Sequence, residues 1–147
     1  ALSPGGAFLY AGNDNSADIS AFAVGTDGNL TPVPGSPFPL PAGGKAAAIA
    51  VDPGGKYAYV ADYNLDAIRV YSIGGDGALA PLAGGVYTLS GPLALAIAVS
   101  GRYLYATSSN QVYGYSISST GTLSPVSGSP YAAGSGAQAI AVVKYAP

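Results

Sequence analysis

The sequence contains no cysteine, histidine, methionine or tryptophan among its 147 residues, and it has no glutamate either. Without cysteine, a disulfide framework and thiol redox chemistry are excluded. Without histidine and cysteine, neither a Ser-His-Asp nor a Cys-His arrangement can be built, and a soft-metal site lacks its usual ligands. We therefore expect no catalytic residues and no cofactor, and we predict that the chain is not an enzyme.

Charge is also scarce. Only 8% of the residues are charged and the net charge is −2, with no cluster of lysine or arginine. Nucleic acids and anionic membranes are bound through such clusters, so we expect neither as a partner. The longest apolar run, around residues 93–99, has the length of a strand and is far too short to cross a bilayer.

Glycine, proline and tyrosine make up much of what is present. The chain has 22 Gly, 12 Pro and 12 Tyr, against 3 Phe. Such a composition favours strands and turns over surface helices, which need charged helix formers. Low charge, many small residues and the missing reactive side chains suit a durable protein outside the cell. We predict a secreted or cell-surface location.

The tetrapeptide Ala-Ile-Ala-Val occurs three times, at residues 48–51, 96–99 and 139–142. Three further markers follow in constant order, with a period of roughly 43–49 residues. They are a tyrosine-rich strand (8–11, 57–60 and 103–106), a second apolar strand (19–24, 68–73 and 112–117), and a Gly-x-Leu-x-Pro segment (28–32, 77–81 and 121–125). We therefore predict four short strands in each unit.

The positions of these strands within a sheet follow from their side chains. Proline cannot donate to a sheet ladder, so the Leu-x-Pro strand belongs at the outer edge. The Ala-Ile-Ala-Val strand carries only small and branched apolar residues, and we expect it at the inner edge, buried on both faces. A narrow inner strand and a proline-marked outer strand are typical of a propeller blade. The sequence thus predicts an all-β fold of three four-stranded blades within one domain, with units near 1–45, 46–92 and 93–136.

Several of these segments resemble the YVTN-type repeats of the seven-bladed lactonase-like β-propeller family. The matching segments are residues 48–62 (AIAVDPGGKYAYVAD), 68–73 (IRVYSI), and the Gly-Ser-Pro-aromatic links at 35–38 and 128–131. The resemblance covers essentially the whole chain, although three units stand where the family has about seven. It implies a propeller fold. Lactone-opening members are expected to use His, Arg and Glu, and because His and Glu are missing, no catalytic residue is carried over.

The best candidate for a metal site is a loop of oxygen-bearing side chains, namely Asn13, Asp14, Asn15 and Asp18. Alternating oxygen ligands suit calcium. The same residues also form ordinary hairpin loops, and the pattern returns at Asp62, Asn64 and Asp66, which favours the loop interpretation. Asn29 begins an Asn-Leu-Thr triplet, a possible glycosylation acceptor. The repeated tyrosines are expected to pack between blades, with a sugar-stacking platform as the alternative.

The two ends of the chain suggest an assembly site. Residues 1–6 resemble 50–55, so the first unit lacks most of its inner strand, whereas the third Ala-Ile-Ala-Val copy has no unit after it. Three blades cannot close a ring, since about four is the minimum. We expect a closing strand at 137–143 to complete the first blade of another copy by strand addition beside Phe8, Leu9, Tyr10 and Ala11. The strand consists of Ala137, Gln138, Ala139, Ile140, Ala141, Val142 and Val143.

The sequence therefore favours a non-enzymatic structural protein that self-associates by exchange of this strand. Reciprocal exchange gives a closed six-bladed ring, and open head-to-tail addition gives a filament. Two alternatives of other classes remain: a fragment of a lactonase-like enzyme, and a surface module that binds a glycan or a cell-surface partner through its loops.

Overall fold

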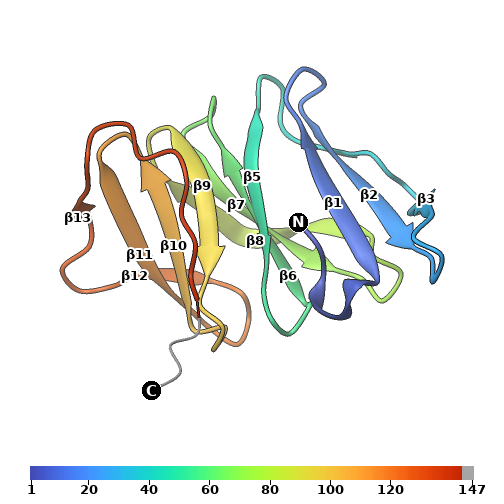
Figure 1. Ribbon diagram of the computed structural model, residues 1–147. Helices are drawn as coiled ribbons and strands as arrows, with labels where there is room; N and C mark the ends of the chain where they lie inside the picture. Colours follow the sequence, from blue (N-terminus) through green and yellow to red (C-terminus); the bar gives the residue numbers. More distant parts are fainter. Residues whose placement is uncertain (144–147) are drawn as a thin grey trace.

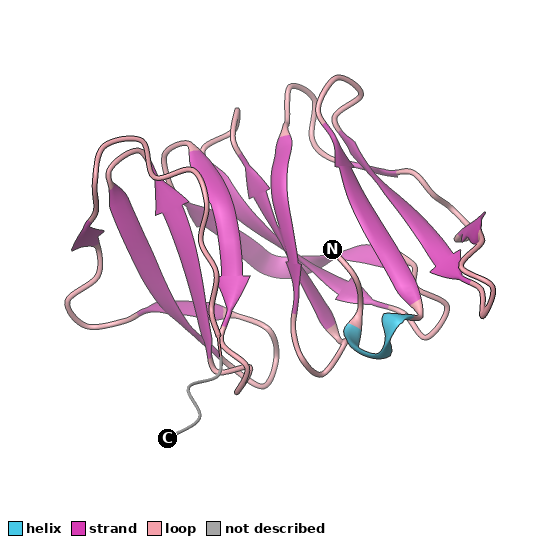
Figure 2. Cartoon of the chain, viewed as in Figure 1, coloured by secondary structure: helices cyan, strands magenta, loops and turns pink. Residues whose placement is uncertain are grey.

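Three antiparallel sheets lie side by side in an arc, each made from one sequence unit (Figure 1). The computed structural model describes residues 1–143. The first sheet pairs its strands in the order β1-β2-β3, with β4 also on β2; the second has the order β5-β6-β7-β8; the third has the order β9-β10-β11-β12, with β13 also on β11. The predicted all-β class is confirmed, because the described residues add only one 3-10 turn, Pro4–Gly6, to the strands (Figure 2).

The strand bounds follow the repeat. The first sheet contains β1 (Phe8–Asn13), β2 (Asp18–Val24), β3 (Leu30–Pro32) and β4 (Phe38–Pro39). The second contains β5 (Ala46–Val51), β6 (Tyr57–Asp62), β7 (Ala67–Ile73) and β8 (Leu79–Thr88). The third contains β9 (Pro92–Ile97), β10 (Tyr103–Ser108), β11 (Gln111–Ile117), β12 (Leu123–Pro125) and β13 (Tyr131–Ala132). The proline-containing strands β3, β8 and β12 lie at sheet edges, as predicted.

The turn between β5 and β6 shows how the sequence sets the register. One carboxylate oxygen of Asp52 accepts hydrogen bonds from the backbone amides of Lys56 and Tyr57, at 2.7 and 2.6 Å, and the other accepts from the amide of Gly54. Gly55 takes a φ of +68°, a conformation that favours glycine. The turn therefore fixes Val51 opposite Ala58 and Ala50 opposite Tyr59.

Two hydrophobic cores separate the three sheets. The core between the first and second sheets is built around Tyr10, Ile19, Val60 and Tyr71; the core between the second and third is built around Tyr59, Ile68, Leu104 and Tyr115. Alternate residues of the second sheet enter opposite cores, as the two-residue period of a strand requires. The middle strands β6 and β7 are accordingly the most buried part of the molecule.

Two expectations about the Ala-Ile-Ala-Val strands need correction. β5 and β9 are mostly half-buried and not fully buried, because no described strand continues the sheet beyond them. In addition, the third copy, within residues 137–143, is not part of a strand in the described chain (Figure 2). Its strand conformation needs a neighbouring edge to pair with, and its pairing in another copy stays a prediction.

Candidate functional site

A polar cluster lies where β6 ends, at the junction of the first and second sheets. Its centre is Asp62, whose side chain is fully buried. Asp62 pairs with Arg69 on the adjacent β7, the carboxylate Oδ2 lying 2.6 Å from Nε. The other carboxylate oxygen accepts a hydrogen bond of 2.9 Å from the backbone amide of Lys45, in the link before β5. Burial of a carboxylate is tolerated here because a cation and main-chain donors satisfy it.

The cluster extends toward solvent through Lys45. Its ammonium lies 2.8 Å from Asp14 Oδ2 and 5.8 Å from the centroid of the Tyr63 ring. Asp14 is more than half exposed, so this outer pair contributes little to stability. The cluster therefore joins the β1–β2 loop, the link after β4 and the hairpin after β6, and its charges are matched one to one.

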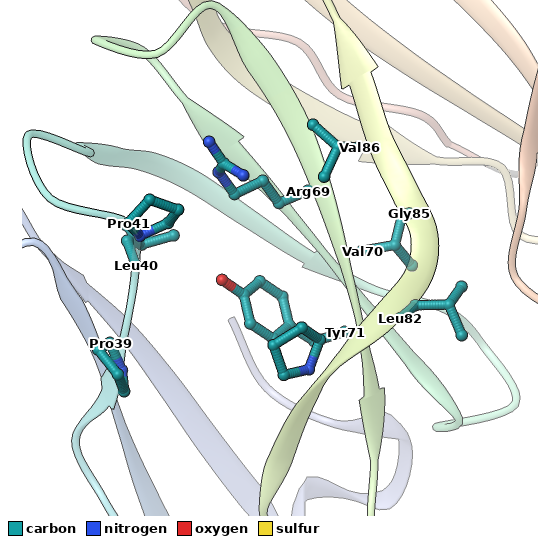
Figure 3. Close-up of a pocket in the computed structure, with 10 residues that line it drawn as sticks. Pro39, Leu40, Pro41, Arg69, Val70, Tyr71, Leu82, Gly85 and Val86 are labelled. Carbon is teal, nitrogen blue, oxygen red and sulfur yellow. The ribbon is translucent and has the colours of Figure 1, made fainter.

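Beside the Asp62–Arg69 pair lies a pocket of about 190 Å³ (Figure 3). Its walls come from the link between the sheets and from β7 and β8, and they comprise Pro39, Leu40, Pro41, Arg69, Val70, Tyr71, Pro81, Leu82, Gly85 and Val86. The Tyr71 hydroxyl and the Arg69 guanidinium are its polar groups. The volume is below the range of about 300–1,000 Å³ usual for sites of drug-sized ligands.

The chemistry available in this pocket is hydrogen bonding through one phenol, which can donate and accept, and one guanidinium. Burial is the main cause that raises the pKa of Tyr71, with the Asp62 charge adding and the Arg69 charge opposing, so the phenol stays protonated at neutral pH. The arginine guanidinium can only donate hydrogen bonds. The one carboxylate nearby, Asp62, is engaged by Arg69 and backbone amides. The pocket therefore offers donors to a small carbonyl group but no free base or nucleophile.

The four calcium candidates do not form a set of free oxygen ligands. The Asn13 side-chain amide donates to Asp18 Oδ1 at 2.6 Å and to Ser20 Oγ at 2.8 Å, and Asp14 is paired with Lys45. Asn15 is exposed in the turn. Within residues 1–143, no group of three or more acidic, His or Cys side chains is placed to hold a metal ion. The contacts fit the hairpin-loop interpretation, which the sequence favours over calcium binding.

The remaining predicted residues, Asn29 and the repeated tyrosines, lie in a turn and mostly in the cores between the sheets. Asn29 is exposed in the turn before β3, where its side-chain amide donates to Asp27 Oδ2. The buried tyrosines Tyr10, Tyr59, Tyr71 and Tyr115 pack in the cores between sheets, as predicted. Tyr103 differs, because it is 40% exposed on the third sheet.

The predicted assembly edge is partly occupied. Ala1 and Tyr10 exchange two main-chain hydrogen bonds of 2.8 Å, and the Ser3 amide donates to the Phe8 carbonyl at 2.8 Å. Leu2 thus stands opposite Leu9, as Val51 stands opposite Ala58 in the second sheet. Beyond Tyr10, β1 pairs with β2 alone among the described residues. The open part of the edge is therefore Ala11–Asn13.

Sequence reasoning missed the Asp62–Arg69 pair and the pocket beside it. A signal was present: residues 62 and 69 flank a short hairpin, so their strands are neighbours, and Arg69 is the only charge within its strand. The pocket itself depends on how residues 39–41 cross from one sheet to the next, which no local pattern encodes.

The strand order within each sheet and the arc of three similar sheets define a class of protein, the β-propeller. This chain forms three blades of such a propeller. The model of the family described as lactonase, 7-bladed β-propeller, matches residues 1–136, and the chain belongs to this family. No curated protein matches it. Among the described residues no helix is long and apolar enough to cross a membrane.

Solved structures give the same fold. A Bacteroides uniformis protein described as a candidate 6-phosphogluconolactonase is 25% identical, with a TM-score of 0.79 over 90% of this chain and 39% of that protein. A similar protein from Bacteroides fragilis is 20% identical, with a TM-score of 0.79 over 90% and 38%. The periplasmic gluconolactonase of Pseudomonas aeruginosa is 23% identical, with a TM-score of 0.72 over 85% and 39%. The chain thus spans about two-fifths of the length of these proteins.

Proposed function

We propose that this chain acts as a three-blade section of a lactonase-type propeller that associates with further blades, and that its own contribution is structural and not catalytic. The observation that carries the proposal is the pair of unfinished ends. Among the described residues no inner strand pairs with β1 along Ala11–Asn13, and residues 137–143, which carry an inner-strand sequence, lie outside any strand. An unpaired edge and an unpaired apolar segment of matching sequence favour strand addition.

The register of this addition follows from the second sheet, where Ala48, Ile49, Ala50 and Val51 stand opposite Ala61, Val60, Tyr59 and Ala58. The same alignment sets Ala139 and Ile140 of one copy opposite Gly12 and Ala11 of another. Ala141 and Val142 would then need the places that Ala1 and Leu2 hold. Full insertion beside Phe8–Ala11 therefore requires residues 1–3 to leave the edge, whereas insertion up to Ile140 does not.

The expected gain is large enough to drive association. Full insertion of the strand contributes on the order of 5–10 kcal/mol before the lost pairing of residues 1–3 is subtracted, from about 25 cal/mol per Å² of apolar area and about 1 kcal/mol per new hydrogen bond. This is comparable with the stability of an entire domain. The order of attachment decides the product, because reciprocal exchange closes a ring of six blades and open addition gives a filament.

Light scattering on the 147-residue chain and on a version lacking residues 137–147 tests the proposal. We expect the 147-residue chain to form oligomers, and we expect the shortened one to associate more weakly with the same sheet signal in circular dichroism. Electron micrographs would separate rings from filaments. A monomeric 147-residue chain with an intact fold would contradict the proposal.

The comparisons favour a second candidate, lactone hydrolysis, because the family and the three similar structures reported above carry a lactonase description. The pocket beside Arg69 and Tyr71 supplies donors for a carbonyl oxygen but no free base. We therefore expect no turnover of gluconolactone by this chain. Turnover that is lost in an Arg69→Ala variant, but kept in an Arg102→Ala control, would establish the enzymatic candidate instead.

A further inference from the structure

The two junctions between sheets are built from the same contact. At the first, Phe8 and Tyr10 of β1 lie against Gly77, in the turn that precedes β8. The Tyr10 hydroxyl donates to the Gly77 carbonyl at 3.0 Å, and a Cβ added at Gly77 would overlap the Phe8 ring. At the second, the Tyr59 hydroxyl donates to the Gly121 carbonyl at 3.1 Å, and a Cβ added at Gly121 would lie 2.6 Å from the Tyr57 ring.

We call residues 8 and 10, 57 and 59, and 103 and 105 the aromatic pairs, and residues 25–29, 74–78 and 118–122 the glycine turns. Each junction inserts the aromatic pair of one sheet into the glycine turn of the next. Three sheets provide three pairs and three turns, and two junctions use two of each. One aromatic pair and one glycine turn are left.

The unused aromatic pair is Tyr103 and Tyr105 on the third sheet. Tyr103 stands opposite Ser116, as Tyr57 stands opposite Ser72 in the second sheet, so the two strands share one register. Tyr103 is 40% exposed, and no described residue accepts a hydrogen bond from the Tyr105 hydroxyl. By contrast, Tyr10 and Tyr59 are buried.

The unused glycine turn surrounds Gly28 on the first sheet, and it already has the shape of the occupied ones. Gly28 has a φ of +80°, against +85° for Gly77 and +80° for Gly121. The amide of Gly28 donates to the Gly25 carbonyl at 2.9 Å, as that of Gly77 donates to the Gly74 carbonyl. A Cβ added at Gly28 would have no heavy atom within 4 Å among its described surroundings.

The strand after this turn is also exposed where its repeat equivalents are buried. Leu30, in β3, is 47% exposed, whereas its repeat equivalents Leu79 and Leu123 are 6% and 5% exposed and belong to the two cores. Leu9 and Phe22, which face the same side as Leu30, are only half-buried. An apolar sheet face that is core elsewhere in the repeat marks an interaction surface.

We propose that the third sheet of one copy packs on the first sheet of a second copy, with the Tyr103 ring over Gly28 and the Tyr105 hydroxyl donating to the Gly28 carbonyl. The partner is a second copy, because the unused aromatic pair and the unused glycine turn are the two halves of the contact that both internal junctions contain. The contact is heterologous, so it propagates head to tail. It rests on the proposed self-association but uses the sheet faces and not the strand at 137–143.

Sedimentation velocity over a range of concentrations tests this contact on the 147-residue chain. Tyr105→Phe removes one hydroxyl donor and is expected to weaken association roughly five- to tenfold. Gly28→Asn fills the turn with a side chain that tolerates positive φ, and is expected to weaken it roughly ten- to a hundredfold by overpacking. Matched controls are Tyr131→Phe, at another exposed tyrosine, and Gly43→Asn, at a glycine with a φ of +83° and open surroundings in the link.

The outcomes separate this proposal from strand exchange. Weakening by both face variants with unchanged controls supports the sheet-face contact. If both face variants associate like the unchanged chain, the contact is overturned, whereas strand exchange stands as long as removal of residues 137–147 still weakens association. A monomeric unchanged chain overturns both. Should Gly28→Asn fail to fold, as judged by circular dichroism, Tyr105→Phe alone decides.

Discussion

At the scale of single residues, a few polar side chains accept hydrogen bonds from backbone amides and so take the place of main-chain carbonyls. Asp52 accepts three amide hydrogen bonds in its turn, and Ser36 and Ser129 accept from the amides of Ala21 and Gly114 at equivalent places in the first and third sheets. Asp62 is the one buried carboxylate among the described residues. Because no other carboxylate of residues 1–143 is buried, this residue is where a polar substitution should matter most.

Replacing Asp62 with Asn is expected to destabilise the fold by about 3–5 kcal/mol, because Arg69 would keep its charge in a buried setting without a counter-ion. The matched control is Asp14→Asn, which breaks the exposed pair with Lys45 and should change stability by less than about 1 kcal/mol. Urea denaturation followed by circular dichroism measures both. Equal effects of the two substitutions would mean that burial does not govern the Asp62–Arg69 pair.

At the scale of strands and turns, the repeat in the sequence predicted the number, order and sheet positions of the main strands. Period-two patterns in 57–62 and edge prolines at 32, 81 and 125 report local requirements, and local requirements are visible in sequence. The inner strands were predicted too deeply buried, because their burial depends on neighbours that this arc does not supply. The pocket also depends on distant segments meeting, which no short pattern records, whereas the Asp62–Arg69 pair spans a single hairpin and leaves a local signal.

The glycine turns offer a test at this same scale. Gly77→Asn keeps the positive φ accessible but places a side chain against the Phe8 ring, so we expect a loss of about 1–3 kcal/mol from overpacking. Gly28→Asn puts the same residue at the same φ into open surroundings. At protein concentrations where the chain is monomeric, thermal unfolding should therefore show a lower midpoint for Gly77→Asn and little change for Gly28→Asn. Equal midpoints would argue against the packing of Phe8 on Gly77.

At the scale of the whole molecule, tyrosines connect the sheets, and this makes stability depend on alkaline pH. Burial, with the Asp76 charge adding, raises the pKa of Tyr10 to about 12. Burial also raises the pKa of Tyr59, Tyr71 and Tyr115 above the ordinary value of 10. In the unfolded chain all four phenols lose their protons near pH 10. Between about pH 10 and 12, the unfolded state therefore binds fewer protons than the folded one.

The contribution of these phenols to stability should therefore be constant below about pH 10 and should fall as the pH rises from about 10 to 12, since a folded-state pKa above the unfolded value favours folding only while the unfolded phenols are still protonated. Urea midpoints measured at steps across this interval would show the fall. A Tyr10→Phe, Tyr59→Phe double variant should have a lower midpoint at neutral pH, because the carbonyls of Gly77 and Gly121 lose their donors, but a flatter slope above pH 10. Ultraviolet absorbance adds an independent reading: in the folded protein Tyr10 should ionise only near pH 12, because burial raises its pKa. If all tyrosines instead ionised together near pH 10 while the sheet signal persisted, the phenols could not be buried between the sheets, and the shared junction contact would be wrong.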